Sequence, residues 1–359
     1  MPINSREGNL SALPVESGHC PLCKSRGLLL YDQLSDRLFG TKKSWRLLQC
    51  FNKNCAHAWI DPMPSDDELS KAYENYYTHV GSEGDDSWLR KKYKACRSAY
   101  LATEYGYDAS NVGFIYTMAG RLITILMPHR KAAFDSSVMW LPAIRGGRVL
   151  EIGCGRGELI ANLDSLGWEV VGIEPDPKSG AIATKRGLSV RIEELSYDSF
   201  DSNSFDAIVM SHVIEHVKKP VELLKICRKI LKPEGRLLVL TPNIGSLGHS
   251  WFKSDWLHLD PPRHLNLFTR QSLLQTFKNG GFEASSCKTT LRNADWTFGG
   301  SMSLRKYGSY KFGKLPISLK LLGLIILYFE WLALMFDKGI GEELLATGRK
   351  ICDSVDFVK

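Results

Sequence analysis

Between residues 146 and 242, short apolar runs alternate with segments of helical length. The apolar runs end in Gly, Asp, Ser or Asn, and they read GGRVLEIGCG, WEVVGIEPD, GLSVRIEE, FDAIVMS and GRLLVLTPN. Residues 157–166, 175–186 and 220–232 lie between them and have the length and apolar spacing of helices. This alternation predicts a parallel sheet that is covered by helices on both faces.

The rest of the chain divides into segments with different patterns. Residues 63–145 have mostly helical periodicity and many Tyr and Trp residues, and we interpret them as a helical substrate or lid region. Residues 1–17 indicate a flexible tail, and residues 342–359 include EELLATGRK, which we interpret as a final strand. The other segments are a cysteine-bearing part at 18–62, the strand-and-helix core at 146–312 and an apolar helical insertion at 313–341.

Residues 315–336, LPISLKLLGLIILYFEWLALMF, form an apolar run of 22 residues that is long enough to span a bilayer. On a helix, Lys320 and Glu330 fall within a polar arc of roughly 100°, and the remaining surface is apolar. A glutamate in mid-membrane costs about 2.5–3.5 kcal/mol, and the chain must return to the sheet for its final strand. We therefore favour a helix or hairpin that lies on a membrane surface or packs on residues 112–127, with a dimer interface or buried packing as the alternatives.

Composition narrows the classes of function. The 359 residues are enough for about two domains, and 44% of them are hydrophobic. The chain has a net charge of +7 and no run of five like charges. This mild positive charge permits anionic substrates or lipid head groups as ligands but does not indicate nucleic-acid binding. The N-terminus has no apolar core segment, so we expect no signal peptide. Nine cysteines, an odd number, then favour reduced thiols in a cytoplasmic protein.

Four of the cysteines have the spacing of a zinc ribbon. Cys20-x2-Cys23 and Cys50-x4-Cys55 are separated by 26 residues, and tetrahedral zinc needs four soft ligands on tight turns. A segment this short needs such a staple because it buries little apolar surface alone. The second pair is wider than the usual spacing, so His57 stands as an alternative ligand, and free thiols are the structural alternative. The segment lacks interleaved basic and aromatic residues, which favours a scaffold over a nucleic-acid-binding role.

The run VLEIGCGRGEL places Gly153, Gly155 and Gly157 after a buried strand and before a helix. Glycines there let the backbone come close to a nucleotide, and a helix N-terminus favours polar ligand groups. The third glycine comes one residue too early for the dinucleotide pattern G-x-G-x-x-G, and Glu158 fills that place. Glu174, at the end of the next strand, lies 21 residues after Gly153 and can accept both hydroxyls of a ribose.

His212, Glu215 and His216, in HVIEH, match the H-x-x-E-H pattern of a class of zinc peptidases. A peptidase needs this pattern inside a long helix, whereas here it leaves the strand FDAIVM and meets Pro220 four residues later. We therefore reject the peptidase interpretation. Ligands of parallel sheets bind at the carboxyl ends of strands, and there the three side chains share one face if the turn is helical.

The run E-x-G-x-G-x-G from Glu151 to Gly157, followed by the acidic strand end at Glu174, closely resembles the class I S-adenosylmethionine-dependent methyltransferases. The likeness continues through FDAIVMSHVIEHV and LKPEGRLLVLTPN. With CPLC, DPMPSDDELSKAYENYY and GEELLATGRK, the chain resembles a bacterial zinc-ribbon subgroup linked to polysaccharide or deoxysugar biosynthesis. The resemblance covers nearly the whole chain and implies an α/β fold with a Rossmann-like, doubly wound, seven-stranded sheet whose final strand is antiparallel.

The resemblance also implies which residues bind S-adenosylmethionine. Glu151 and the loop 153–157 hold the methionine part, Glu174 holds the ribose, and Asp176 and either Glu193 or Glu194 lie near the adenine. Ser211 and His212 border the cofactor. The complete predicted set is Glu151, Gly153, Cys154, Gly155, Gly157, Glu174, Pro175, Asp176, Glu194, Ser211 and His212.

Methyl transfer requires an aligned acceptor that loses a proton, and His216 is the first candidate for the base. Glu215 orients this histidine or binds a substrate hydroxyl. His264 is the second candidate, and it lies in WLHLDPPRHLNLF (residues 256–268), which we expect to form a lid over the acceptor. Three tyrosines are further candidates for this pocket: Tyr73, Tyr76 and Tyr77.

Two other interpretations of HVIEH stay open. The segment resembles E-x-x-E-H of quinone O-methyltransferases, in which three groups bind a divalent cation such as Mg²⁺, although His212 replaces the first acid. In the structural alternative, His212 and His216 only cap the turn between strand and helix.

We thus expect methyl transfer from S-adenosylmethionine to a small or lipid-linked acceptor, with a sugar of a surface polysaccharide favoured. The alternatives are a quinone or other lipid acceptor, and a module that binds the cofactor without catalysis. Structural zinc is the second expected cofactor, and nucleic acid is not an expected partner. The expected place is the cytoplasm, with peripheral contact at the inner face of the membrane through 315–336, and a homodimer, as further hypotheses.

Overall fold

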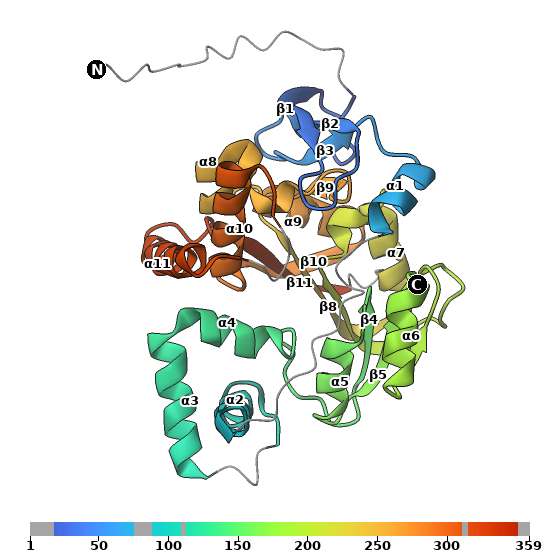
Figure 1. Cartoon of the computed structure of the whole chain (residues 1–359). Coiled ribbons are helices and arrows are strands. Elements are labelled where there is room, and N and C mark those ends of the chain that lie inside the picture. The colour runs from blue at the N-terminus through green and yellow to red at the C-terminus, as the bar shows by residue number, and fades with distance from the viewer. Residues whose placement is uncertain (1–17, 75–87, 109–112, 311–314, 351–359) are drawn as a thin grey trace.

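The computed structural model describes residues 18–74, 88–108, 113–310 and 315–350 (Figure 1). Its largest sheet has seven strands, and helices lie between most of them along the chain. The strands are β4 (Arg148–Ile152), β5 (Glu169–Ile173), β6 (Val190–Arg191), β7 (Phe205–Ser211), β8 (Leu231–Pro242), β10 (Phe282–Thr290) and β11 (Glu343–Lys350). The helices between them include α5 (Glu158–Asp164), α6 (Pro177–Lys185), α7 (Pro220–Ile230) and α9 (Arg270–Asn279). The tail assigned to residues 1–17 lies outside the described residues.

The strand order is β10-β11-β8-β7-β4-β5-β6. The five strands from β8 to β6 are parallel to their neighbours, whereas β11 is antiparallel to both β8 and β10. The order reverses direction between β4 and β7, and ligands of open α/β sheets bind at the carboxyl ends of the strands near such a point. The predicted Rossmann-like sheet with an antiparallel final strand is confirmed.

The near-continuous apolar runs of the sequence result from burial of the sheet on both faces. Leu150 and Leu237 belong to one buried cluster, and their chain neighbours Val149 and Leu238 belong to another. Successive side chains of a strand point to opposite faces, so each of these strands contributes to both clusters. A strand with only one covered face would instead alternate between apolar and polar residues.

The cysteine-bearing segment forms a second, antiparallel sheet of four strands. Three of them are consecutive: β1 (Gly27–Ser35), β2 (Ser44–Cys50) and β3 (Ala58–Asp61). The fourth is β9 (Asn266–Leu267), in which Leu267 pairs with Ala58 of β3. This pairing joins the N-terminal sheet directly to the 256–268 segment, so the ribbon and the predicted lid form one packed unit.

The remaining helices flank these two sheets. Before the large sheet come α1 (Asp66–Tyr73), α2 (Trp88–Tyr105), α3 (Phe114–Leu126) and α4 (Pro128–Ser136). After β8 come α8 (Leu247–Phe252), α10 (Ala294–Tyr307) and α11 (Ile317–Ala333), with the 3-10 turns η3 (Lys253–Asp255) and η4 (Leu257–Leu259). A further 3-10 turn, η2 (Ile214–His216), lies between β7 and α7. Figure 1 shows α2, α3 and α4 grouped at the opposite end of the molecule from β1, β2 and β3.

The apolar segment contains α11, which packs closely on α10. A Cβ atom at Gly323 would lie 2.3 Å from the carbonyl oxygen of Asp295, so only glycine permits this approach. The sequence pattern placed Lys320 and Glu330 on one polar arc, but the structure separates them, because Lys320 is exposed and Glu330 is fully buried. Burial raises the pKa of Glu330 well above its ordinary value. Within the described ranges, no helix is both long enough and apolar enough to cross a membrane.

Candidate active site

The glycine loop connects β4 to α5 and leaves its backbone open at Gly155. Gly153, Gly155 and Gly157 all have positive φ angles, of 67°, 53° and 78°, a region that side-chain-bearing residues rarely adopt. A Cβ atom at Gly153 would lie 2.6 Å from a methyl carbon of Val213, whereas one at Gly155 would meet no atom within 4 Å. The loop therefore packs against HVIEH on one side and offers bare backbone to a ligand at Gly155.

Glu174 follows β5 and connects the two adjacent loops. One of its carboxylate oxygens accepts a hydrogen bond from the Gly155 amide at 2.7 Å, and the other accepts one from the Asp176 amide at 2.9 Å. Burial raises its pKa, although these two amides oppose the shift. The carboxylate is thus fixed at the carboxyl edge of the sheet, beside the open backbone of the glycine loop.

Glu151, within β4, has a buried side-chain carboxyl group, and one of its two oxygen atoms lacks a hydrogen-bond partner. Its side chain is 5% exposed, and Oε2 has no hydrogen-bond partner. Burial, with the nearby charge of Glu174, raises the pKa of Glu151 well above its ordinary value. An unsatisfied buried carboxylate is costly, so this group favours a ligand that brings a cation or several N–H donors. The ammonium group of a methionine moiety has this chemistry.

The other predicted cofactor residues lie around this loop with different surroundings. Cys154 is buried, whereas Pro175 and Glu194 are exposed, and Ser211 ends β7 at partial exposure. Asp176 caps α6, because its carboxylate accepts hydrogen bonds from the amides of Lys178 and Ser179. The structure therefore brings Glu151, Glu174 and the three glycines together. The carboxylate of Asp176 is instead engaged in capping α6.

His212 is held by charged partners that the sequence did not connect with it. Its Nε2 lies 2.9 Å from Oε1 of Glu343 and 3.2 Å from Arg292, and its Nδ1 lies 3.2 Å from Oε1 of Glu215. Burial alone would lower the pKa of His212, but the carboxylates of Glu343 and Glu215 outweigh it and raise the pKa to about 9. His212 is therefore a cation at neutral pH and neutralises two buried acids.

Glu215 and His216 lie in the turn η2, directly after β7. The Thr241 hydroxyl donates to Oε2 of Glu215 at 2.9 Å. Burial would raise the pKa of Glu215, but the hydrogen bond and charge of His212 lower it to about 2. Burial, together with the neighbouring His264, lowers the pKa of His216 to about 4. The pair is therefore a carboxylate and a neutral imidazole at neutral pH.

The 256–268 segment brings His264 and His258 onto the same cluster. The ring centroids of His216 and His264 are 4.7 Å apart, and those of His258 and His264 are 6.4 Å apart. His258 and His264 are both buried. The expected lid is thus a closely packed segment whose inner side contributes His264 to the site.

One of the three predicted tyrosines reaches this cluster. The hydroxyl of Tyr73, at the end of α1, lies 2.9 Å from Nδ1 of His216. Tyr76 and Tyr77 lie outside the described residues. The contact places the first helix after the ribbon beside the candidate base.

Arg263 ties the segments around the site together. It is fully buried, and its guanidinium donates to both carboxylate oxygens of Asp36, to Asp260 and to the backbone carbonyl of Ala72. Burial would raise the pKa of Asp36, but Arg263 outweighs this effect and lowers it to about 2. One cation therefore links β1–β2, α1 and the 256–268 segment.

The four predicted zinc ligands converge. The sulfur atoms of Cys20, Cys23, Cys50 and Cys55 all lie within 4.8 Å of one another, and three of the four residues are buried. Tetrahedral zinc with Zn–S bonds of about 2.3 Å requires sulfur atoms roughly this close. His57, the alternative ligand, instead places its Nε2 2.9 Å from the side-chain oxygen of Asn266. The geometry is compatible with a zinc ribbon that uses all four cysteines.

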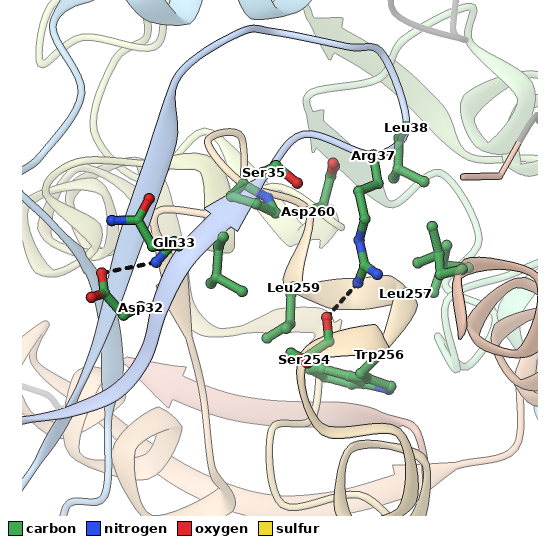
Figure 2. A pocket seen from close by; sticks show the side chains of 13 residues that line it. Asp32, Gln33, Ser35, Arg37, Leu38, Ser254, Trp256, Leu257, Leu259 and Asp260 are labelled. Atoms are coloured by element: carbon green, nitrogen blue, oxygen red, sulfur yellow. Dashed lines mark hydrogen bonds between the residues drawn. The ribbon is translucent and has the colours of Figure 1, made fainter. Parts of the chain in front are cut away.

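A pocket of about 220 Å³ lies between the ribbon and the 256–268 segment (Figure 2). Its lining includes Asp32, Gln33 and Arg37 on one side and Trp256 and Asp260 on the other. Figure 2 shows the Arg37 guanidinium hydrogen-bonded to the backbone of Ser254. None of the predicted cofactor residues lines this pocket, so it is separate from the glycine loop.

Sequence reasoning missed Glu343, Arg292 and Thr241, which surround His212 and Glu215. They lie on or next to β11, β10 and β8, and no motif marks them. The one available signal was the expectation that residues after 342 form a final strand, because that strand brings its first residues to the carboxyl edge beside β8.

Comparisons with known proteins agree with this arrangement. Residues 129–286 match a family model described as a methyltransferase domain. The chain is 34% identical over 109 residues to a ubiquinone biosynthesis O-methyltransferase of Xanthomonas oryzae pv. oryzae, which covers 28% of this chain and 45% of that protein. It is 35% identical over 115 residues to the protein of the same name from Bradyrhizobium diazoefficiens, covering 31% and 46%. The chain thus spans about half the length of these curated relatives.

Among solved structures, an S-adenosylmethionine-dependent methyltransferase from Mesorhizobium loti aligns with a TM-score of 0.43 at 16% identity, covering 61% of this chain and 98% of that one. The family match over 129–286 includes the glycine loop, Glu174 and HVIEH, and the sheet around them is of the predicted seven-stranded type. Residues 129–286 are therefore similar to a methyltransferase domain, and they lie in a Rossmann-like sheet.

Proposed function

We propose that this chain transfers a methyl group from S-adenosylmethionine to a small or lipid-linked acceptor that is bound at the histidine cluster. The observation that carries the proposal is the buried carboxylate of Glu151, whose unpaired oxygen lies in the strand that leads into the open glycine loop. Bound S-adenosylmethionine supplies an activated methyl group. Glu151 would pair with its ammonium group, Glu174 would accept its ribose hydroxyls, and Glu215, His216 and His264 would bind and activate the acceptor.

The cofactor half of the proposal is tested with Glu174→Ala. Hydrogen bonds to a charged group contribute about 1.5–3 kcal/mol, so the affinity for S-adenosylhomocysteine should fall about 10- to 150-fold in isothermal titration. Glu169→Ala is the matched control, because this exposed glutamate begins β5, the strand that Glu174 follows, and its carboxylate pairs with Arg148 at the surface. Equal affinities of the two variants would count against the assigned site.

For the acceptor, we favour a sugar of surface polysaccharide biosynthesis and keep a quinone as the alternative. The ribbon that packs on the 256–268 segment supports the first, through the resemblance of the whole chain to zinc-ribbon enzymes. The similarity to ubiquinone biosynthesis O-methyltransferases of Xanthomonas and Bradyrhizobium supports the second. Methylation assays with nucleotide-linked sugars and with hydroxylated quinones separate the two. A cofactor-binding module without catalysis predicts no product from either class.

We further propose that Cys20, Cys23, Cys50 and Cys55 bind one structural zinc ion. The expected metal content is one zinc per chain by elemental analysis, and Cys20→Ser and Cys55→Ser should each lose it, because a site with three thiolates holds the ion less tightly. Cys96→Ser is the control, since this buried cysteine lies on α2, away from the ribbon. Full zinc content in both ribbon variants would rule out the four-cysteine site.

We also propose that α3 and α11 form a peripheral membrane surface at the cytoplasmic face. Ile115 and Ile125 are 78% and 66% exposed on α3 and its C-terminal turn, and Ile325 and Phe329 are 66% and 53% exposed on α11. The two helices meet where the Tyr328 hydroxyl donates to the carbonyl of Leu126. Arg121 and Lys320 are exposed, whereas Glu330, the one acid within these two helices, is buried. An apolar surface with only basic exposed charges matches anionic lipids.

Flotation with vesicles that contain phosphatidylglycerol tests this surface. The wild-type chain should bind the vesicles. The double variant Ile325→Glu/Phe329→Glu should not bind them, because each change inserts a charge into the apolar face. Ile192→Glu is the control, since Ile192 is also exposed but follows β6 on another part of the molecule. If the wild-type chain does not bind vesicles, and light scattering shows a wild-type dimer that the double variant loses, the apolar surface is a dimer interface and not a membrane-binding surface.

A further inference from the structure

The pocket between the ribbon and the 256–268 segment is a second site, apart from the groups assigned to methyl transfer. Neither the glycine loop nor any of Glu215, His216 and His264 lines it. Its volume is about 220 Å³, which is below the roughly 300–1,000 Å³ of pockets for drug-sized ligands. The pocket therefore suits a small ligand, about the size of a single sugar ring.

A bulge in the ribbon sheet forms the outer wall of this pocket. Tyr31 pairs with Leu47 and Leu34 pairs with Trp45, so two residues of β1, numbers 32 and 33, stand opposite a single residue of β2. Such bulges are frequent beside binding and active sites, where they redirect side chains.

Two lining residues also have an uncommon backbone conformation. Gln33, in the bulge, has a φ of 53°, and Asp260, on the facing segment, has a φ of 32°. Residues with side chains rarely adopt positive φ angles, and those that do concentrate at ligand-binding and active sites. Both walls of the pocket, which come from distant parts of the chain, carry this feature.

The cation in the lining and one of the two acids are already paired. The Arg37 guanidinium donates to Oδ1 of Asp255 at 2.7 Å and to the carbonyl of Ser254. Asp260 is buried, and Nε of Arg263 donates to both of its carboxylate oxygens, at 3.0 and 3.1 Å. An anionic ligand would have to displace one of these partners, so the pocket is poorly suited to phosphate or sulfate.

The other lining groups suit an uncharged ligand that carries hydroxyl groups (Figure 2). Asp32, Gln33 and Ser35 line the pocket and are exposed, and they bring a carboxylate, an amide and a hydroxyl group. Leu257 and Leu259 add buried apolar surface. A sugar ring combines hydroxyl groups, which both donate and accept hydrogen bonds, with an apolar C–H face.

The inner wall of the pocket belongs to the segment that positions His264. The carbonyl oxygen of Asp260 accepts hydrogen bonds from the amides of Arg263 and His264, at 2.9 and 3.1 Å. Nδ1 of His264 lies 2.7 Å from the carbonyl oxygen of His258. Leu257 and Asp260, which line the pocket, flank His258 in the chain, so a ligand there contacts the backbone segment that holds the His264 ring.

We propose that this pocket binds a single uncharged sugar unit. The role of the site rests on the proposed methyl transfer to a sugar: the pocket holds a unit of the acceptor other than the one that receives the methyl group. Binding of this unit fixes the 256–268 segment, which presents His264 to the histidine cluster.

Saturation-transfer difference NMR on the full-length protein tests the proposal, with the methyl glycosides of glucose, galactose, mannose and rhamnose as probes. We expect saturation transfer to at least one of the four. Ser35→Phe should weaken the affinity for that sugar at least about tenfold, because the phenyl ring takes the space that the ligand needs. Inorganic phosphate should not displace the sugar, since Arg37 is already paired.

Ser285→Phe is the matched control, because Ser285 is also an exposed serine in a strand but lies on β10, outside the pocket. It should bind the sugar like the wild type. Thermal unfolding reports on the folding of each variant, and Ser35→Leu replaces Ser35→Phe if the larger side chain prevents folding. No saturation transfer to any of the four sugars, an equal signal in the folded Ser35 variant, or displacement by phosphate would overturn the inference. Titration with S-adenosylhomocysteine reads the cofactor site independently, so failure of the sugar site and failure of the proposed methyl transfer are distinguished.

Discussion

Replacing His216 by alanine is expected to lower the turnover number about 10²- to 10⁴-fold, the range for loss of a group that assists proton transfer. The affinity for S-adenosylhomocysteine should stay unchanged. The imidazole is neutral at working pH, partly exposed and hydrogen-bonded at Nδ1, so Nε2 is directed to the acceptor either as a base or as a metal ligand. The substitution removes the imidazole and therefore abolishes both roles. The cofactor site keeps its residues, so cofactor affinity should not change.

His129→Ala is the control for this variant. His129 lies on α4, where its ring packs against Tyr328, and it takes no part in the histidine cluster. Single-turnover rates with a methylated product as the readout separate the chemical step from product release. A near-normal rate for His216→Ala would assign the activation of the acceptor to His264 alone, and the same measurement on His264→Ala then decides.

Replacing Arg263 by methionine is expected to lower the free energy of unfolding by about 3–5 kcal/mol, the cost of removing one partner from a buried ion pair. The change leaves Asp36 and Asp260 with buried charges and no cation, and it removes the donor to the Ala72 carbonyl. Because the guanidinium connects the ribbon to the 256–268 segment, the ribbon should also become the first part to exchange its amide hydrogens.

The surface pair of Arg305 and Asp255 provides the comparison. The side chain of Arg305 is 48% exposed and its contact with Asp255 is 3.2 Å long. Exposed pairs contribute about 0–1 kcal/mol, so Arg305→Met should change the midpoint of urea unfolding only slightly. Similar losses for the two variants would show that Arg263 does not act through its buried carboxylates.

The cofactor half of the site followed from local sequence because its parts are close along the chain. A strand, a glycine turn and a helix fix one another's geometry within a few residues, and the acidic end of the next strand lies beside them in any parallel pair. Glu151, Gly155 and Glu174 therefore came together where the pattern placed them. The same locality accounts for the four cysteines, whose two pairs each occupy a tight turn.

The acceptor half was less predictable because its contacts join distant segments. Glu343 reaches His212 only because β11 inserts antiparallel between β8 and β10. Asp36 reaches Arg263 only because β9 extends the ribbon sheet. In both cases the pairing is between residues far apart in sequence, and no periodicity marks which buried acid meets which cation.

The sequence by itself determined the sheet, the cofactor loop, the convergence of the four cysteines and the rejection of a peptidase, since each depends on short-range spacing of apolar, glycine or thiol positions. The tertiary structure decided the orientation of α11, where a glycine contact turns Glu330 inward and leaves apolar side chains outside. It also decided the partners of HVIEH, because His264 joins Glu215 and His216 through a segment that is held in place by the ribbon. The physical reason is that the burial of a side chain and the choice of its charged partner depend on which distant segments pack against each other, and local sequence does not specify this packing.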